Sequence, residues 1–200
     1  MYRFYLAAMD LLPGALLLLP VYLLLHKVYF RSIRKSILYY LFSCYLSVVY
    51  VLVGLPNITY IRPELNLNLI PILGIAADLK NSLLNILLFI PLGIALPAMW
   101  NKYKTQKNTL CFGFGMSLAI ELAQILTYRA TDINDLITNT LGSLIGFLFA
   151  KVLLHIFPAA KHFANHTQGT ELTAVLNIVI LVMFFIYPFV SAALWDLLLA

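Results

Sequence analysis

Polar side chains recur at helical spacing inside apolar stretches of this 200-residue chain. Glu121 and Gln124 are three residues apart, and Asp135 and Asn139 are four apart, so each pair shares one face of a helix. A charged group at the centre of a membrane helix costs about 2.5–3.5 kcal/mol on insertion scales, and it usually faces the protein interior or a wet cavity. Glu121 is therefore the residue for which a functional role is most strongly predicted.

These side chains are expected to line one polar cleft among three helices, open to the outside of the membrane. Arg129 lies in the connecting loop, where its guanidinium could hold a phosphate or carboxylate through two hydrogen bonds. A carboxylate of the cleft could act as an acid or base, but no nucleophile paired with a base stands out, so binding is favoured over catalysis. The candidate ligand-binding residues are Asn85, Glu121, Gln124, Arg129, Asp132, Asp135 and Asn139.

Each candidate also has a structural explanation. Asp132 and Asp135 stand at the start of a helix, where carboxylates cap free backbone N–H groups. Glu121 could form an ion pair with Arg129 or be kept protonated by burial. The amide side chains could simply form hydrogen bonds between helices.

Glycines at helical spacing are expected to pack helices together. Gly142 and Gly146 form a Gly-x-x-x-Gly pattern, and Gly93 lies on a related stripe of another helix. No metal site is predicted, because the His162/His166 spacing is a weak signal in a loop. No cofactor is predicted either, since the sequence contains no phosphate-binding glycine loop.

The composition predicts where these helices lie. Apolar residues make up 62% of the chain and charged residues 10%, against roughly 45–50% and about 25% in soluble domains. This excludes a disordered chain, a soluble enzyme and a nucleic-acid module, and it predicts an integral membrane protein. The expected fold is all-α, a polytopic transmembrane helical bundle of about six spans in a single domain covering 1–200. The spans are expected at about 5–25, 36–55, 82–100, 109–127, 132–157 and 174–195.

The distribution of Lys and Arg among the loops sets the expected orientation. The loop with Lys27 and Arg31 and the loop with Lys102 and Lys104 carry no acidic residue, whereas the second and fourth loops are mixed in charge. Because cytoplasmic loops are enriched in Lys and Arg, both termini are expected on the extracytoplasmic side. The expected location is the cell membrane, crossed several times, with membrane lipids as partners.

Three stretches resemble the VanZ-like family of bacterial membrane proteins, which is named for a member associated with resistance to the glycopeptide teicoplanin. They are Asn68-Leu69-Ile70-Pro71, the stretch from Asn85 to Gly93, and the stretch from Ser117 to Gly146, in which Glu121-x-x-Gln124, Arg129, Asp132, Asn134-Asp135 and Asn139-x-x-Gly142 follow one another. The resemblance covers about 36–157 as a family core and leaves 174–195 as an additional C-terminal helix. It implies a role in the bacterial cell envelope.

Three classes of function remain open. The first is a protein that binds or modifies an amphiphilic envelope molecule in the cleft: a lipid, a lipid-linked cell-wall precursor or a glycopeptide, with a contribution to glycopeptide resistance. The second is a small proton-coupled exporter with Glu121 as its relay, although no inverted repeat accompanies it. The third is a non-catalytic assembly factor whose polar stripe only joins helices. No nucleic-acid partner is predicted.

Overall fold

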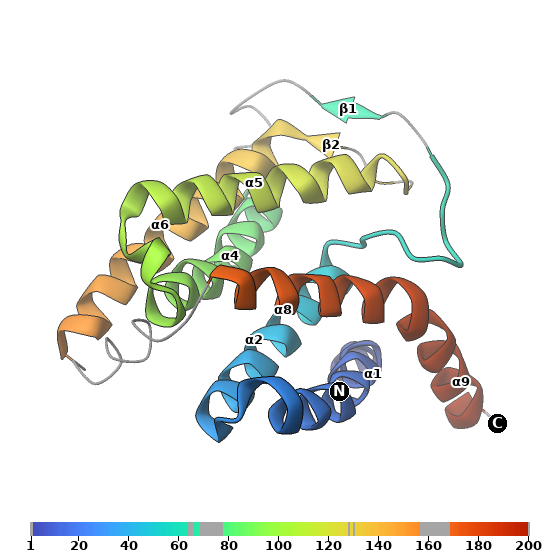
Figure 1. The fold of residues 1–200 in the computed structure, drawn as a ribbon. Coiled ribbons are helices and arrows are strands. Elements are labelled where there is room, and N and C mark those ends of the chain that lie inside the picture. The colour runs from blue at the N-terminus through green and yellow to red at the C-terminus, as the bar shows by residue number, and fades with distance from the viewer. Residues whose placement is uncertain are drawn as a thin grey trace. The chain divides into compact units, whose positions relative to one another are not determined.

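The computed structural model describes residues 2–63, 66–68, 78–127, 129, 131–156 and 169–199, and these are mainly helical (Figure 1). The elements are α1 (Tyr2–Leu25), the π-helical turn η1 (His26–Phe30), α2 (Ile33–Leu52), β1 (Leu67–Asn68), α4 (Leu79–Met99), the 3-10 turn η2 (Asn101–Lys104), α5 (Gln106–Gln124), β2 (Thr131–Asp132), α6 (Ile133–Ile156), α8 (Gly169–Leu181), the π-helical turn η3 (Val182–Ile186) and α9 (Tyr187–Leu199). The all-α fold expected from the sequence is thus confirmed. The part of the predicted Leu-Ile-Pro element at 69–71 lies outside the described residues.

Five helical segments within the described residues are long and apolar enough to cross a membrane. They are Leu12–Phe30, Ile33–Leu52, Leu79–Met99, Ile133–Ile156 and Thr170–Leu197. These segments indicate a multi-pass membrane protein.

One predicted span differs from the others. The segment 109–127 was expected to cross the membrane, and it forms α5, a helix of 19 residues that is not among the five apolar segments. Gln106, Lys107 and Asn108 open this helix, and Glu121 and Gln124 lie in its last turn. These polar ends shorten its continuous apolar stretch.

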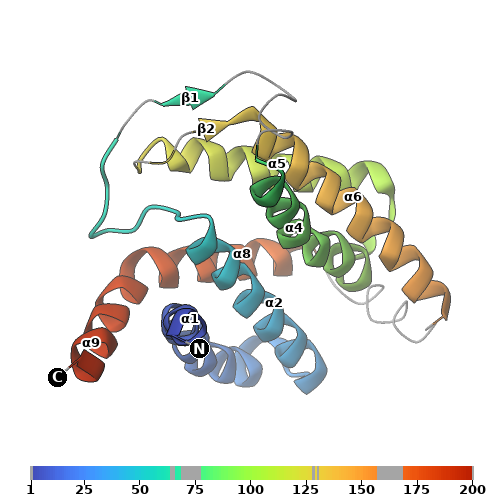
Figure 2. The ribbon, with the colours of Figure 1, turned by 180° about the vertical axis from the view of Figure 1, so that it is seen from behind.

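The chain divides into two compact units, and the unit formed by Arg62–Glu171 is built on a close pair of helices, α4 and α6. Gly142 of α6 lies against the backbone of Ile86 in α4, and Gly146 lies against Ile90, one turn further along both helices. Because the residue numbers of the contacting positions increase in the same direction in both helices, α4 and α6 run parallel, as Figure 2 shows.

Glycine makes the approach of α4 and α6 possible. A Cβ at Gly142 would clash with the carbonyl oxygen of Ile86, and one at Gly146 would lie 2.9 Å from the Cα of Gly93. A Cβ at Gly93 would in turn lie 2.9 Å from the backbone nitrogen of Phe147. All three glycines that the sequence assigned to helix packing therefore lie where two membrane helices touch through their backbones.

Helix α5 covers the α4–α6 pair and runs antiparallel to α6. Ser117 of α5 contacts Asn139 of α6, and Gly113, one turn earlier in α5, faces Ser143, one turn later in α6. As a result, the C-terminal end of α5 lies beside the N-terminal end of α6.

Carboxylates fix the start of both central helices. Asp78 precedes α4 and accepts a 3.2 Å hydrogen bond from the backbone N–H of Asn81. Asp132 precedes α6 and accepts a 2.8 Å hydrogen bond from the backbone N–H of Asn134. Each carboxylate satisfies an N–H group that has no partner within its helix.

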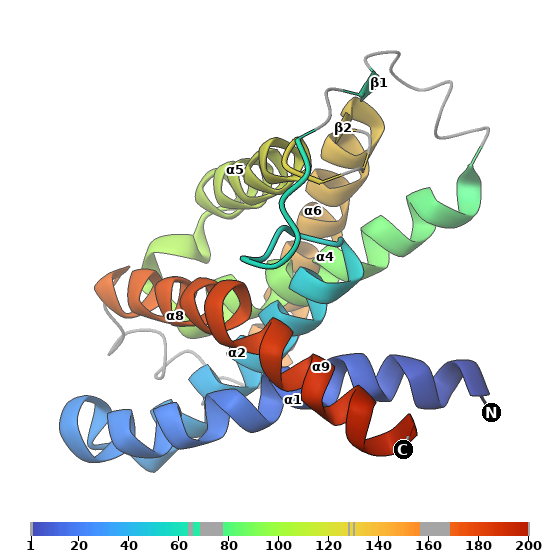
Figure 3. The ribbon, with the colours of Figure 1, turned by 90° about the vertical axis from the view of Figure 1, so that its right-hand side faces the viewer.

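The second unit comprises Met1–Ile61 and Leu172–Ala200. Its helices α1 and α2 form an antiparallel hairpin, which is visible in Figure 3. The hydroxyl groups of Tyr22 and Ser43 are hydrogen-bonded at 2.6 Å, and the hydroxyl of Tyr40 donates to the carbonyl of Ala15 at 3.2 Å. Hydrogen bonds between polar side chains of neighbouring helices are a common means of joining membrane helices.

Large apolar side chains cover the outside of both units. Leu23, Leu87, Val152 and Phe189 are each more than half exposed. Apolar surface of this extent is unfavourable in water, and it suits the hydrocarbon interior of a bilayer.

Candidate functional site

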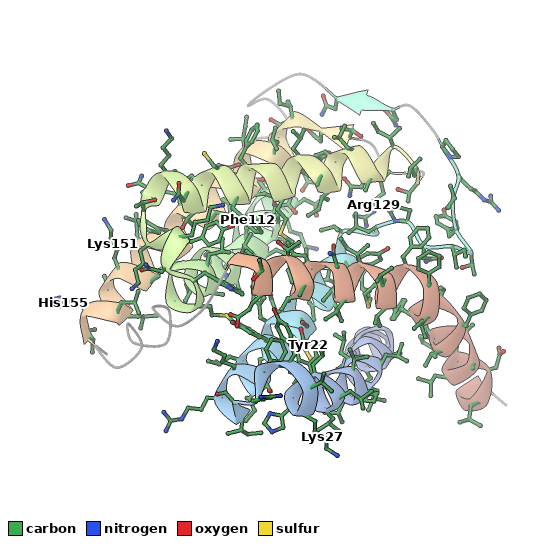
Figure 4. The ribbon with its side chains drawn as sticks, viewed as in Figure 1. Tyr22, Lys27, Phe112, Arg129, Lys151 and His155 are labelled. Carbon is green, nitrogen blue, oxygen red and sulfur yellow. The ribbon has the colours of Figure 1, made fainter. Side chains whose placement is uncertain are left out.

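The predicted site residues of the Arg62–Glu171 unit gather at one end of its helices. Glu121 lies in the last turn of α5, Asp135 in the first turn of α6, and Asn85 in the second turn of α4. Figure 4 shows Arg129 beyond the end of α5, whereas Lys151 and His155 lie toward the other end of α6. The antiparallel course of α5 brings these positions together.

Glu121 is almost completely buried, with 4% of its surface exposed. Its Oε2 accepts a 2.8 Å hydrogen bond from the backbone N–H of Asp132. Its backbone carbonyl accepts a 3.1 Å hydrogen bond from the hydroxyl of Thr131. The sequence suggested Arg129 as one partner of this carboxylate. The structure adds the backbone amide of Asp132, which ties the end of α5 to the start of α6.

Asp132 lies at the centre of a network of amide donors. Its Oδ1 accepts from the backbone N–H and from the side-chain Nδ2 of Asn134, at 2.8 Å and 2.7 Å. Its Oδ2 accepts from Nδ2 of Asn68 at 3.0 Å. Asp132 therefore caps α6, which is the structural explanation that the sequence offered for it. Its carboxylate also accepts a hydrogen bond from Asn68, which lies 64 positions earlier in the chain.

Asn68 reaches Asp132 through a short parallel strand pair. Leu67 and Asn68 of β1 align with Thr131 and Asp132 of β2. The backbone N–H of Thr131 donates to the carbonyl of Asn66 at 2.9 Å. Figure 1 shows the two strands side by side near the C-terminal end of α5. This pairing holds strand β1 against the start of α6, where Asp132 lies.

Asp135 connects the third helix and the arginine to the site. The side-chain amide of Asn85 in α4 hydrogen-bonds its carboxylate, and the guanidinium of Arg129 interacts with it electrostatically. Asp132 and Glu121 both lie within electrostatic range of Asp135. Like charges this close repel one another, and the amide donors and Arg129 offset that repulsion.

Asn139 lies one turn deeper in α6 than Asp135. Its Nδ2 donates a 2.9 Å hydrogen bond to the hydroxyl of Ser117 in α5. Both side chains are buried. Its Oδ1 is also buried and has no hydrogen-bond partner among the described residues. Such an acceptor carries a free-energy cost until a donor reaches it.

Six of the seven candidates lie with three neighbouring polar residues at this end of the unit, in a group that we call the polar cluster. Its members are Asn68, Asn85, Ser117, Glu121, Arg129, Asp132, Asn134, Asp135 and Asn139. The seventh candidate, Gln124, is buried at the last position of α5. The open cleft expected around these residues stays a prediction. Within the part of the chain that the structure describes, no group of three or more His, Cys, Asp or Glu side chains is placed to hold a metal ion.

Sequence reasoning did not assign a role to Gly113 or Ser143. A Cβ at Gly113 would lie 2.7 Å from the Cβ of Ser143, so the two residues pack α5 directly against α6. The signal was present in the four-residue spacing of Thr109, Gly113, Ser117 and Glu121, a stripe of small and polar residues. No comparable signal marked the pairing of Asn68 with Asp132.

Comparison with known proteins identifies the family. The family described as VanZ/LLP1 matches residues 14–157. This match begins earlier than the stretch of 36–157 on which the resemblance was based, and it includes the second half of α1. No curated protein and no solved structure gave a significant match. Since the family match covers well over half of the chain, the protein belongs to the VanZ/LLP1 family.

Proposed function

We propose that this VanZ-type membrane protein binds the polar head of an amphiphilic envelope molecule at the polar cluster, on the outer side of a bacterial cell membrane. The observation that carries the proposal is the convergence of Glu121, Asp132 and Asp135 from separate elements at one end of the unit. Intramembrane carboxylates are costly, and proteins that retain them commonly use them for function.

The arrangement favours binding over reaction. The carboxylate of Glu121 is bonded to a backbone amide, and that of Asp132 to side-chain and backbone amides. None of these described partners is a hydroxyl or thiol that a carboxylate could activate as a nucleophile. Carboxylates held in this way are oriented acceptors for donors on a ligand.

The class of ligand follows from the surroundings. Exposed apolar side chains such as Leu87 and Leu122 lie on the same helices as the polar cluster, so one molecule could place an apolar part along the helices and a polar part at the cluster. A membrane lipid, a lipid-linked cell-wall precursor and a glycopeptide all have this character. Binding of either of the last two would allow a contribution to glycopeptide resistance.

Two substitutions test the proposal. Glu121→Gln removes the charge and retains an oxygen that can accept from the Asp132 amide, and Arg129→Ala removes the guanidinium. Each should weaken binding of fluorescent lipid, lipid-linked precursor or teicoplanin by about 10- to 100-fold, because a hydrogen bond to a charged group contributes about 1.5–3 kcal/mol. Asp196→Asn and Lys80→Ala change the same charges at exposed positions and should leave binding intact.

Protein level, thermal stability and glycopeptide susceptibility complete the test. Stable Glu121→Gln and Arg129→Ala variants that bind all three ligands normally would contradict the proposal. If Arg129→Ala lowers stability and Asp135→Asn restores it in the double variant, the charges are a structural pair. That outcome would favour the assembly-factor hypothesis.

A further inference from the structure

The turn between α1 and α2 carries a dense group of cations. Lys27, Arg31 and Arg34 are exposed, and Lys35 is partly exposed. No Asp or Glu occurs between Asp10 and Glu64, so the local sequence of the turn carries an excess of positive charge. We call residues 26–35 the basic hairpin. It joins two of the five apolar segments, and therefore lies where the chain leaves the hydrocarbon.

The basic hairpin is held in one conformation. Arg31 adopts a left-handed backbone conformation with φ of 49°, and its N–H donates to the carbonyl of His26 at 3.0 Å. Nδ1 of His26 and the hydroxyl of Ser36 are 3.0 Å apart and hydrogen-bonded. Behind the turn, the rings of Phe30 and Tyr39 pack edge to face with centroids 5.0 Å apart. A fixed turn presents its cations without the cost of ordering the backbone at each binding event.

Apolar side chains flank the cations on the outside of the turn. Val28 is 75% exposed, Ile33 is 60% exposed and Tyr29 is 54% exposed. Figure 4 shows Lys27 pointing away from the protein beside this turn. Alternating cations and exposed apolar groups are typical of surfaces that bind membranes, because both the headgroup charge and the acyl region find partners.

A second basic turn in the other unit provides a contrast. Lys102, Lys104 and Lys107 lie around η2 and the start of α5. Tyr103 is buried there, and Trp100 is buried too. Within the described residues between Leu87 and Phe114, no large apolar side chain is exposed. This turn therefore has charge without apolar flanks.

We propose that the basic hairpin is a binding site for anionic phospholipids, with Arg31 and Arg34 holding the phosphate and Val28 and Ile33 contacting the acyl region. Guanidinium groups bind phosphate oxygens through paired hydrogen bonds, which a lysine ammonium cannot do. The site shares no residue with the polar cluster and does not depend on its function.

The test uses the full chain in neutral detergent with two lipids that have the same acyl chains. Phosphatidylglycerol and phosphatidylcholine are titrated separately, and native mass spectra give an apparent dissociation constant for each. In the triple variant Lys27→Gln/Arg31→Gln/Arg34→Gln, the preference for phosphatidylglycerol over phosphatidylcholine should fall by up to roughly 100-fold, while lipid binding at the polar cluster is retained. The charge-matched control Lys102→Gln/Lys104→Gln/Lys107→Gln should keep the preference of the natural chain.

Two further measurements separate the contribution of the charges to lipid binding from that of the apolar side chains. About 0.5 M NaCl should reduce the preference of the natural chain for phosphatidylglycerol, because salt screens exposed charges. Val28→Ser/Ile33→Ser should weaken binding of both lipids and preserve the ratio between them. Circular dichroism and thermal unfolding of each variant establish that it is folded.

Several outcomes would overturn the proposal. One is a natural chain without preference for phosphatidylglycerol, and another is an equal loss of binding in the two triple variants. A preference that survives the hairpin substitutions would also overturn it, as would stronger binding of an acidic peptide than of phosphatidylglycerol. Because the polar cluster is unchanged in every variant, these outcomes do not bear on the proposed function.

Discussion

The side-chain amide of Asn139 in α6 donates a 2.9 Å hydrogen bond to the hydroxyl of Ser117 in α5. Both groups are buried between the two helices. The bond lies one helical turn below the carboxylates of Glu121 and Asp135, so it links the candidate site to the packing of the helices that carry it.

The first prediction concerns this bond. Ser117→Ala and Asn139→Leu should each destabilise the protein, and a double-mutant cycle should show a coupling of about 0.6–1.7 kcal/mol, the range found for hydrogen bonds between membrane helices. Unfolding in a denaturing detergent gives the four free energies. As a control, Ser117→Ala combined with Thr140→Val should show no coupling, because the Thr140 hydroxyl bonds the Leu136 carbonyl of its own helix. A coupling near zero for the first pair would refute this prediction.

The second prediction concerns the backbone contact of α4 and α6. Gly142→Leu and Gly146→Leu should each lower stability by at least about 1–3 kcal/mol and reduce the amount of folded protein, because the side chain would collide with a facing carbonyl. Gly115→Leu is the matched control, since no atom lies within 4 Å of a Cβ at that position. Detergent thermal stability and protein yield are the readouts. Normal yields of both α6 variants would show that the helices do not pack in this way.

The third prediction concerns the strand pair. Asn68→Ala removes the hydrogen bond to Asp132 and should loosen β1 from β2. Exchange of the Thr131 amide hydrogen should become about 5- to 10-fold faster, since the loss of a hydrogen bond to a charged group costs at least about 1 kcal/mol. Hydrogen exchange followed by mass spectrometry measures this. Asn57→Ala, which breaks a turn contact to Thr59 in the other unit, should leave Thr131 exchange unchanged.

The fourth prediction concerns orientation. A single Cys at Lys104 in a background without Cys44 and Cys111 should not react with an impermeant reagent added from outside, because the loop is basic. Cysteines at both termini should react. If α5 does not cross the membrane, the number of crossings is odd and the two termini would label from opposite sides. Labelling of only one terminus would therefore correct the predicted topology.

The sequence predicts the helices, and it predicts that their polar residues lie near one end, for a physical reason. Apolar runs of about 20 residues have few stable alternatives to a membrane helix, and counting 1.5 Å per residue along each helix places Glu121 and Asn139 in the same half of the membrane. The four-residue spacing of Gly142 and Gly146 predicts close helix packing just as directly, because only small residues allow helix backbones to touch.

Other features depend on contacts that leave little trace in local sequence. The partner of Glu121 is a backbone amide, and every residue except proline supplies one. Asn68 and Asp132 are distant in the chain, so no helical or strand periodicity relates them. Helix α5 was predicted to span because its centre is apolar, whereas the polar residues of its two ends exclude it from the five apolar segments.

The β1–β2 pairing has a consequence for the order in which the protein is made. In the sequence, β1 precedes α4 and β2 follows α5. The pairing can therefore form only after both helices have left the ribosome. Contacts between distant segments form late, because the chain between them must first be ordered. A nascent chain halted before Thr131 would contain α4 and α5 but lack the amide that binds Glu121. The hydrogen bond between Glu121 and the Asp132 amide would then mark the stage of synthesis at which this end of the unit is complete.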